Sequence, residues 1–404
     1  MSKKNIAVIF GSRSCEHEVS IITAIQFMEN MDKEKYNIIP VYITEKGIWY
    51  TGDALMKYGT YKFFDKNLPK LKQVILPPDP TVKGLLSLPT KLFQKVEKIP
   101  LDVVVISVHG MNGEDGTVQG LLELADIPYV SSGVLGSSVG MDKIVMKSVF
   151  AAHNLPITKY EYFLRNEWYD NKDTIIKDLE GKLNYPMFVK PANLGSSIGI
   201  SKAKNTNDLI NAIEIAVQYD KRIIVEEGID NLIEINCAAM GYDKFVEASV
   251  CEQPTSWEEF LTFDDKYLKG INKDAAKKNQ NNEPGSMNTM DRKIPADIPN
   301  DLTIKIQELA IETFKALSCS GTARIDFLVD KNTMTPFINE INTIPGCFSY
   351  YIWEYDNKYP YPKLIDKLID IAIKVNIEKN KNNYTYQAKI INNLGKGGKL
   401  GGKM

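Results

Sequence analysis

Residues Phe188–Ile200 read FVKPANLGSSIGI and join a short apolar strand to a glycine-rich turn. The strand delivers Lys190, and the turn contains two glycines and two serines: Gly195, Ser196, Ser197 and Gly199. Glycines let backbone N–H groups converge on an anion, and a lysine adds a positive charge for phosphate oxygens. The spacing is not GxxxxGK[ST], so this is not a Walker-type loop. The stretch predicts a phosphate-binding turn, with a tight turn beside a structural lysine as the simpler alternative.

Two segments further along the chain place polar side chains at strand spacing. Arg324 and Asp326 are two residues apart, as are Glu340 and Asn342, so each pair shares one face of a strand. Asp326, Glu340 and Asn342 form an oxygen-only set suited to Mg²⁺ that bridges phosphates. Arg324 beside this set would neutralise charge on a transferring phosphoryl group or a developing oxyanion. The alternative is a solvent-facing sheet surface with compensating charges.

Acidic residues mark two more candidate positions. Glu226 and Glu227 end a strand-like run, and Glu234 follows. A carboxylate there can accept hydrogen bonds from a ribose, and the backbone at a strand end can form hydrogen bonds with an adenine edge. A solvated acidic turn explains these residues equally well. Glu16, in SCEHEVS (residues 14–20), lies near a helix start and is suited to a substrate ammonium, although the residues alone favour a first-turn acid that stabilises the helix dipole. His17 and His153 are expected to be surface histidines.

The rest of the chain predicts an α/β fold. Four strands separated by helical patterns indicate a parallel, Rossmann-like sheet: Asn5–Phe10, Ile38–Ile43, Asp102–Val108 and Ile127–Val130. We expect Ser14 to cap the helix after the first strand. Later strands are expected at Met187–Lys190, Arg222–Glu226, Arg324–Val329 and Pro336–Asn342, and a helix at Pro362–Val375.

Composition excludes several classes of protein. The 404 residues include 49 Lys plus Arg and 51 Asp plus Glu, a formal net charge of −2, so the basic surplus of a nucleic-acid binder is missing. No apolar run approaches the roughly 18 residues of a membrane span, and no signal peptide is visible at Met1–Lys4. Five scattered cysteines without a CxxC pair argue against zinc and favour a reducing cytoplasm.

The motifs together resemble the ATP-grasp superfamily and, within it, the D-alanine–D-alanine ligase family. The resemblance runs from about Asn5 to Ile373. It rests on seven stretches in order: EHEVS (16–20), VHGMNGEDGTVQGLLELADIPYV (108–130), GMDK (140–143), KPANLGSSIGISK (190–202), DDKYL (264–268), CSGTARIDF (319–327) and NEINTIPG (339–346). The implied fold is a Rossmann-like N-terminal domain (1–130) and a two-part, α+β ATP-grasp unit (131–228 and 229–380). A lid loop (269–292) and a tail (381–404, flexible at 395–404) complete the expected organisation.

The resemblance also implies a role for each site residue. ATP would contact Lys143, Lys190, Ser197, Glu226, Glu227, Ile229, Glu234, Lys266 and Asn342. Two Mg²⁺ ions, with Mn²⁺ as an alternative, would bind Asp326, Glu340 and Asn342. Glu16 would bind the ammonium of the first D-alanine and form a hydrogen-bonded set with Ser196 and Tyr267. Arg324 and the N–H of Gly346 would form the oxyanion hole, and His109 would lie near the first substrate's carboxylate.

The implied activity is ATP-dependent joining of two D-alanines through an acyl phosphate, for peptidoglycan precursors in the bacterial cytoplasm. The substrates are small molecules, no nucleic acid or membrane takes part, and family members often form homodimers. The segment Cys347–Asp366 departs from the family pattern: Tyr351 aligns with a serine that grips the second substrate, and Ser349 is a substitute for it. The alternatives are therefore a ligase with D-serine or another D-amino acid as acceptor and, remotely, a non-catalytic nucleotide sensor.

Overall fold

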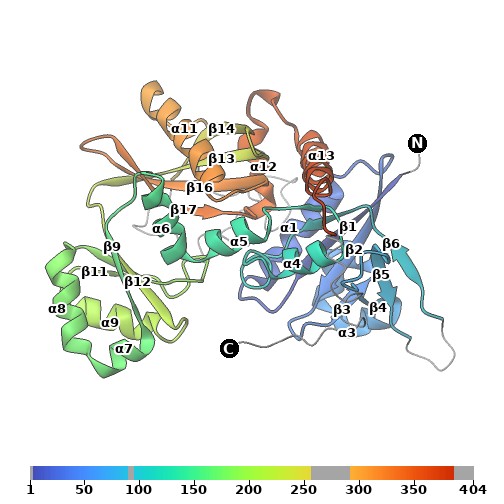
Figure 1. Ribbon diagram of the computed structural model, residues 1–404, viewed down its shortest axis with the longest axis horizontal. Coiled ribbons are helices and arrows are strands. Elements are labelled where there is room, and N and C mark those ends of the chain that lie inside the picture. Colours follow the sequence, from blue (N-terminus) through green and yellow to red (C-terminus); the bar gives the residue numbers. More distant parts are fainter. Residues whose placement is uncertain (1–2, 90–94, 256–291, 386–404) are drawn as a thin grey trace, which may run out of the picture.

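The computed structural model describes residues 3–89, 95–255 and 292–385, which form three β-sheets with helices around them (Figure 1). The predicted positions Lys266 and Tyr267, most of the expected lid and the end of the tail lie outside these residues. Within the described residues, no helix is long and apolar enough to cross a membrane.

The first sheet has eight strands in the order β6-β5-β4-β3-β2-β1-β7-β8. The bounds are β1 Lys4–Gly11, β2 Tyr36–Ile43, β3 Trp49–Thr51, β4 Lys72–Ile75, β5 Gly84–Ser87, β6 Lys98–Pro100, β7 Val103–Ile106 and β8 Tyr129–Val130. Strands β2, β1, β7 and β8 are parallel, which confirms the predicted Rossmann-like core. Strands β3 to β6 extend it as an antiparallel edge that the sequence patterns did not indicate.

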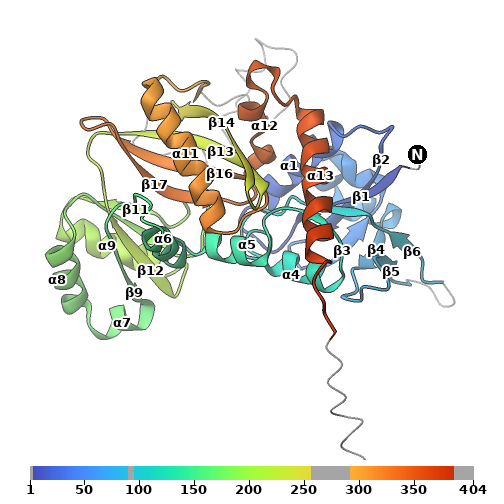
Figure 2. The same cartoon turned by 45° about the horizontal axis from the view of Figure 1, so that its top comes forward.

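Helices bury both faces of this sheet, so its central strands are apolar throughout. Residues Ile6 to Phe10 of β1 have no exposed surface. The covering helices include α1 (His17–Glu29), α4 (Thr117–Leu124) and α13 (Tyr361–Lys379), and two short helices, α2 (Tyr58–Lys62) and α3 (Phe64–Asn67), precede β4. Although α13 is the last described helix, its Leu364 and Leu368 belong to the same core as β1, and Figure 2 shows it alongside this sheet.

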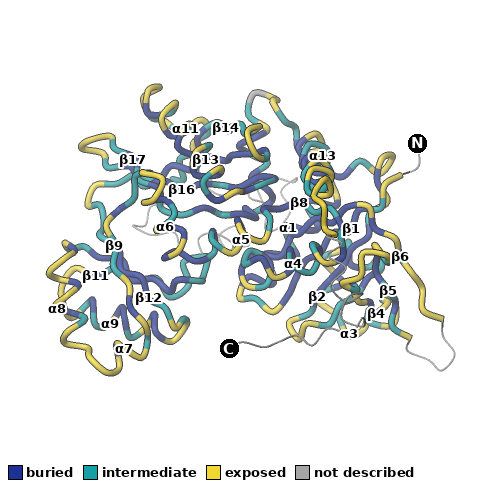
Figure 3. The backbone as a smooth tube through the Cα atoms, viewed as in Figure 1, coloured by how far each residue is buried: buried dark blue, intermediate teal, exposed yellow. Residues whose placement is uncertain are grey.

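The second sheet is antiparallel, in the order β11-β10-β12-β9. Its strands are β9 (Tyr160–Leu164), β10 (Met187–Pro191), β11 (Ser201–Ala203) and β12 (Arg222–Glu227). Helices α7 (Arg165–Asp170), α8 (Lys172–Lys182) and α9 (Thr206–Ala216) cover one face of it and expose their outer surfaces (Figure 3). Helices α5 (Val134–Met141) and α6 (Lys143–Ala152) connect the first sheet to it, and Asp142 caps α6 by accepting the N–H groups of Ile144 and Val145.

The third sheet is also antiparallel and has the order β15-β14-β13-β16-β17. Its strands are β13 (Leu232–Tyr242), β14 (Phe245–Pro254), β15 (Arg292–Lys293), β16 (Gly321–Asp330) and β17 (Thr335–Asn342). Helix α11 (Asn300–Ala316) packs Ile306 and Phe314 against one face. The short helix α12 (Tyr350–Trp353) lies near β14, between this sheet and α13.

Two predictions about the first loop are wrong. Helix α1 begins at His17, and Ser14 accepts a hydrogen bond from the N–H of Glu16 at 3.1 Å instead of from a helical N–H. His17 is buried, because its ring contacts the carbonyl of Ser12 at 2.6 Å and the hydroxyl of Tyr42 at 2.9 Å. His153 is exposed, as expected.

Candidate active site

The glycine-rich turn after β10 lies against the start of α1. Ser196 and Ser197 have positive φ angles of 51° and 59°, and Gly199 has a φ of 72°. A Cβ on Gly199 would lie 2.8 Å from Tyr219 and 2.9 Å from Pro191, so no larger residue fits there. The hydroxyl of Ser196 donates to the carboxylate of Glu16, which is 8% exposed. The turn and the first helix therefore meet through a polar contact that joins two sheets.

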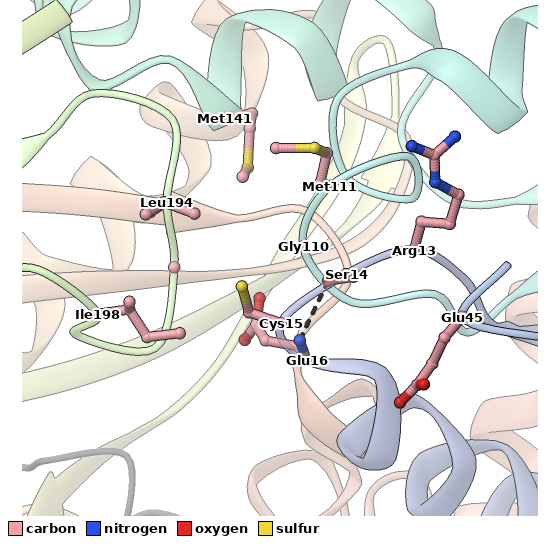
Figure 4. Close-up of a pocket in the computed structure, with 11 residues that line it drawn as sticks. Arg13, Ser14, Cys15, Glu16, Glu45, Gly110, Met111, Met141, Leu194 and Ile198 are labelled. Carbon is pink, nitrogen blue, oxygen red and sulfur yellow. Dashed lines mark hydrogen bonds between the residues drawn. The ribbon is translucent and has the colours of Figure 1, made fainter. Parts of the chain in front are cut away.

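A cavity of about 370 Å³ opens beside this contact (Figure 4). The first loop contributes Ser14, Cys15 and Glu16, the loop after β7 contributes Met111, and the turn after β10 contributes Leu194 and Ile198. Figure 4 shows Cys15 and Met111 directed into the space between the two loops. Two carboxylates, Glu16 and Glu45, and the guanidinium of Arg13 line the cavity together with small and apolar side chains. A buried carboxylate such as that of Glu16 suits a small substrate with an ammonium group.

Buried lysines form a charged group next to the turn. Lys143 is 6% exposed, donates to the carbonyl of Leu194 at 2.7 Å and lies 3.3 Å from Glu340. Lys190 lies 3.0 Å from Glu226 Oε1 and donates to Asn339 at 3.1 Å. The structure thus brings both predicted phosphate-binding lysines close to acidic partners.

Glu226 lies between two lysines, only one of which the sequence singled out. The second is Lys147, which has no exposed surface and lies 3.1 Å from Glu226 Oε2. Burial opposes ionisation of Glu226, but the charges of Lys147 and Lys190 outweigh it and lower the pKa of Glu226. Burial also lowers the pKa of Lys147, against the opposing charge of Glu226. The Glu226 side chain is therefore engaged inside the protein.

Three other residues predicted to bind the nucleotide lie at the end of β12, just after it and on β13. The carboxylate of Glu227 accepts from the backbone and side chain of Asn184, at 2.9 and 3.1 Å. The backbone N–H of Glu227 donates to the carbonyl of Lys159. Ile229 follows β12 and is partly exposed, and Glu234 is a partly exposed residue of β13.

The predicted oxygen set comes together on β16 and β17. Asp326 lies opposite Glu340, and Arg324 lies opposite Asn342. Arg324 donates to both carboxylate oxygens of Asp326, at 2.7 and 2.8 Å, and Asn342 donates to Asp326 at 3.0 Å. The strand pairing therefore places the arginine and the acidic residues on one face of the sheet.

The donor chemistry of this set fits Mg²⁺. Asp326 and Glu340 provide carboxylate oxygens and Asn342 an amide oxygen, and Mg²⁺ is typically held by one or two carboxylates together with substrate phosphates and water. In the described part of the chain, no cluster of three His, Cys, Asp or Glu side chains could hold a metal ion. An ion at these three residues would therefore depend on oxygen ligands from the substrate.

His109, at the end of β7, is tied to helix α1. Its Nε2 lies 2.9 Å from the hydroxyl of Thr23, its N–H donates to Ser20 and its carbonyl accepts from Ser14. Burial lowers the pKa of His109 to about 4, and the backbone of Ile344 offsets this only in part. The imidazole is therefore neutral near pH 7.

Glu114 is a further candidate that the sequence did not single out. Its carboxylate accepts from the N–H of Gly110 at 2.8 Å and from the N–H of Ile344 at 3.2 Å. It joins the loop after β7 to the segment that leads into Gly346. Burial, together with the charge of Glu16, raises the pKa of Glu114. Glu114 lies within the GEDG stretch (113–116), but the sequence does not reveal its importance because its partner Ile344 lies 230 residues away.

The segment after β17 has an unusual backbone. Gly346 begins a 3₁₀ turn, Gly346–Ser349, in which Cys347, Phe348 and Ser349 have φ angles of 49°, 55° and 54°. The left-handed region is costly for side chains with a Cβ, so surrounding contacts must hold this turn. Ser349 has no exposed surface, and its hydroxyl has no hydrogen-bond partner among the described residues.

Comparison with known proteins agrees with this arrangement. The family model for the D-ala D-ala ligase N-terminus matches residues 5–132, and the model for the C-terminus matches residues 149–370. The chain is 40% identical over 389 residues to the D-alanine--D-alanine ligase of Caldicellulosiruptor bescii, a match that covers 95% of this chain and 99% of the relative.

Two solved structures extend the comparison. The D-alanine-D-alanine ligase from Coxiella burnetii superposes with a TM-score of 0.77 at 28% identity, over 94% of this chain and 97% of that one. The VanG D-Ala:D-Ser ligase from Enterococcus faecalis gives a TM-score of 0.76 at 31% identity, over 92% of this chain and 100% of that one. The chain therefore belongs to the D-alanine–D-alanine ligase family.

Proposed function

We propose that this enzyme joins two molecules of D-alanine to D-alanyl-D-alanine at the expense of ATP, as a step in peptidoglycan precursor synthesis in the bacterial cytoplasm. The observation that carries the proposal is the approach of Lys143 to Glu340, 3.3 Å apart, beside the Ser196–Glu16 contact. This approach supports a site in which Lys143 would bind phosphate, Glu340 would bind Mg²⁺ and Glu16 would bind the ammonium group. The domains that we infer are residues 1–130, 131–228 and 229–380, and a homodimer is the assembly that we expect.

In the first step, the carboxylate of one D-alanine attacks the γ-phosphorus of ATP, which yields an acyl phosphate and ADP. Lys143 and Lys190 would stabilise the charge of the phosphate oxygens. Asp326, Glu340 and Asn342 would hold Mg²⁺, which when bound supplies further neutralisation of those oxygens. Glu16 would hold the substrate's ammonium group, and Ser196 would keep the turn over the phosphates.

In the second step, the amine of the other D-alanine attacks the carbonyl carbon of the acyl phosphate. A tetrahedral intermediate forms and expels inorganic phosphate, which leaves the new amide bond. Arg324 and the N–H of Gly346 would stabilise the oxyanion. Water must be excluded because an acyl phosphate hydrolyses readily, and the turn after β10 covers one side of the site.

The proposal is tested by incubating the full-length protein with ATP, Mg²⁺ and D-alanine and identifying the products by mass. We expect ADP, phosphate and D-alanyl-D-alanine in equal amounts. A second incubation adds D-serine, because the likeness to a D-Ala:D-Ser ligase makes D-serine the main alternative acceptor. A dominant mixed dipeptide would favour that alternative, whereas nucleotide binding without phosphate release from any D-amino acid would favour a sensor and overturn the ligase.

A further inference from the structure

Two buried cysteines lie opposite each other in the third sheet. Cys237 on β13 is paired with Cys251 on β14, and their exposed fractions are 0% and 1%. Residues that are directly opposite in antiparallel strands project to the same face, and both side chains belong to the core between this sheet and α11. The other three cysteines, Cys15, Cys319 and Cys347, lie outside the strands. Across residues 3–89, 95–255 and 292–385, strand pairing therefore brings two thiols together only here.

The two thiols contact each other. A hydrogen bond with the side chain of Cys251, together with burial, raises the pKa of Cys237. The Sγ of Cys237 also lies 3.7 Å from the carbonyl oxygen of Ser249. Cys237 is therefore a protonated thiol near pH 7 that lies against the sulfur of Cys251.

The pairing position allows a disulfide without a change of register. Strands β13 and β14 are joined by two residues, 243 and 244, between the paired Tyr242 and Phe245. Residues that flank a two-residue loop exchange backbone hydrogen bonds, and hydrogen-bonded and non-hydrogen-bonded positions alternate from there. Cys237 lies five positions before Tyr242 and so occupies a non-hydrogen-bonded position. Cα atoms at such positions are about 4.5 Å apart, within the range of about 4.4–6.8 Å that disulfides span.

A bulge beside the cysteines adds to this fit. The register shifts between Cys237 and Ala239, where β14 has one extra residue. The hydroxyl of Ser249 accepts a hydrogen bond from the N–H of Ala238 there, at 2.9 Å. A bulge bends the strand and increases its twist. A twisted strand pair turns opposite side chains out of one plane, as the dihedral angle of about 90° in a disulfide requires.

A neighbouring thiol changes what oxidation does to a core. A lone thiol that reacts with a hydroperoxide becomes a sulfenic acid and then a sulfinic acid, which thiols do not reduce. A sulfinate here would be an unpaired charge among apolar side chains such as Ile235 and Ile306. A second thiol in contact intercepts the sulfenic acid as a disulfide, which carries no charge and is reversible. The paired cysteines therefore offer a harmless end point for oxidation inside this core.

We propose that Cys237 and Cys251 are a redox modification site, at which hydrogen peroxide forms a reversible disulfide between β13 and β14. The sulfur of Cys251 attacks the peroxide: an S–O bond forms, the O–O bond breaks, and one water leaves with the thiol proton. Cys237 then attacks the sulfur of Cys251: an S–S bond forms, the S–O bond breaks, and a second water leaves with the proton of Cys237. The two thiols lose two electrons, which reduce one peroxide to two waters.

Peptide mapping tests this proposal directly. Trypsin cleaves after Lys244, which separates Cys237 and Cys251 onto different peptides. The full-length protein is treated with hydrogen peroxide, unreacted thiols are alkylated in urea, and the peptides are identified by mass without reduction. We expect the two peptides to be joined with the loss of two hydrogens, and dithiothreitol to restore both thiols. Cys319, which is buried without a cysteine opposite it, is the internal control and should stay a free thiol.

Two variants separate the pair from a single reactive thiol. Cys237→Ala removes the partner and keeps Cys251. We expect Cys251 in this variant to gain two oxygens, and dithiothreitol should not reverse the change. Cys319→Ala is the matched control and should form the same disulfide as the natural protein. If Cys237→Ala fails to fold, the map of the natural protein decides alone.

Three results would overturn the site. The first is survival of both thiols at a peroxide dose that oxidises the exposed Cys15. The second is a disulfide of Cys251 with another cysteine or with a second chain. The third is a sulfinic acid at Cys251 in the natural protein. None of these readouts depends on ligase turnover, so the site and the proposed function stand or fall separately.

Discussion

Ser196 donates a hydrogen bond to Glu16 although 180 residues separate them in the chain. One residue belongs to the turn after β10 and the other to the start of α1, so the bond joins the second sheet to the first. It lies at the wall of the cavity that we assign to the first substrate. The contact therefore connects binding of an ammonium group with the position of the phosphate-binding turn.

Replacement of Ser196 by alanine should slow turnover. A hydrogen bond to a charged group contributes about 1.5–3 kcal/mol, which corresponds to a loss of roughly tenfold to a hundredfold if the bond forms in the transition state. The measurement is ADP formation with saturating ATP and D-alanine. Ser201→Ala on β11 is the matched control, and equal losses in both variants would show that the Ser196 hydroxyl has no specific role.

Arg324→Ala should reduce turnover by roughly 10²-fold or more, the range observed when one oxyanion donor is removed. It also removes the two hydrogen bonds that Arg324 donates to Asp326 and leaves only the one from Asn342 among those described. Single-turnover measurement of dipeptide formation checks this effect. The control is Arg165→Ala, which removes a guanidinium far from the site, at the start of α7. Unchanged turnover in Arg324→Ala would show that the strand pair has only a structural role.

Glu226→Gln should lower the free energy of unfolding by roughly 3 kcal/mol, because it leaves two buried lysines without their carboxylate. Urea denaturation measures this change. The double variant Glu226→Leu with Lys147→Met should be more stable than Glu226→Gln, since it removes one of the stranded charges as well. Equal stability of the single variant and the natural protein would contradict the assignment of a buried ion pair.

His109 should make the protein less stable in acid. Its folded-state pKa of about 4 is lower than the ordinary value of 6.5, so between these values the unfolded chain binds a proton that the folded chain does not. The contribution of His109 to the free energy of unfolding is fully present above pH 6.5 and is lost as the pH drops toward 4. The loss at pH 5 should be about 2 kcal/mol.

Thermal unfolding of the natural protein and of His109→Gln, at pH 7 and at pH 5, tests this expectation. The drop between the two pH values should be smaller in the variant. His153→Gln, at an exposed position, should keep the full drop. An identical drop in all three proteins would show that His109 is not the responsible group.

Sequence predicted the strands that are buried on both faces, and it failed where strands are short or contain small residues. Strands β1 and β7 are continuous apolar runs, so their pattern is unambiguous. Strands β3 to β6 have three or four residues each, too few to establish a period. Strand β13 has Cys237, Ala238 and Ala239 at its centre, and small residues indicate strands only weakly.

Residues of the candidate site could be predicted where the groups that act together lie within one short motif. Arg324 and Asp326, or Lys190 and the turn that follows it, can be recognised from local spacing. Lys147 and Glu114 were missed because their significance depends on partners that only the fold brings close, Glu226 and Ile344. The burial of His17 likewise depends on Tyr42, which lies on the neighbouring strand.

The register of the third sheet has a consequence for how related chains can diverge. A row of polar residues crosses this sheet, with Glu340 opposite Asp326, Asp326 opposite Asn236 and Asn236 opposite Glu252. Pairing shifts by one residue beside this row, between Cys237 and Ala239 on β13 and between Asp326 and Phe327 on β16. Because side chains alternate along a strand, an insertion or deletion within these strands would turn part of the row to the opposite face. Related chains can therefore carry substitutions along the row, but insertions and deletions are confined to the turns at 243–244 and 331–334. Divergence around the proposed metal site would thus occur by substitution, while Asp326 keeps its place opposite Glu340.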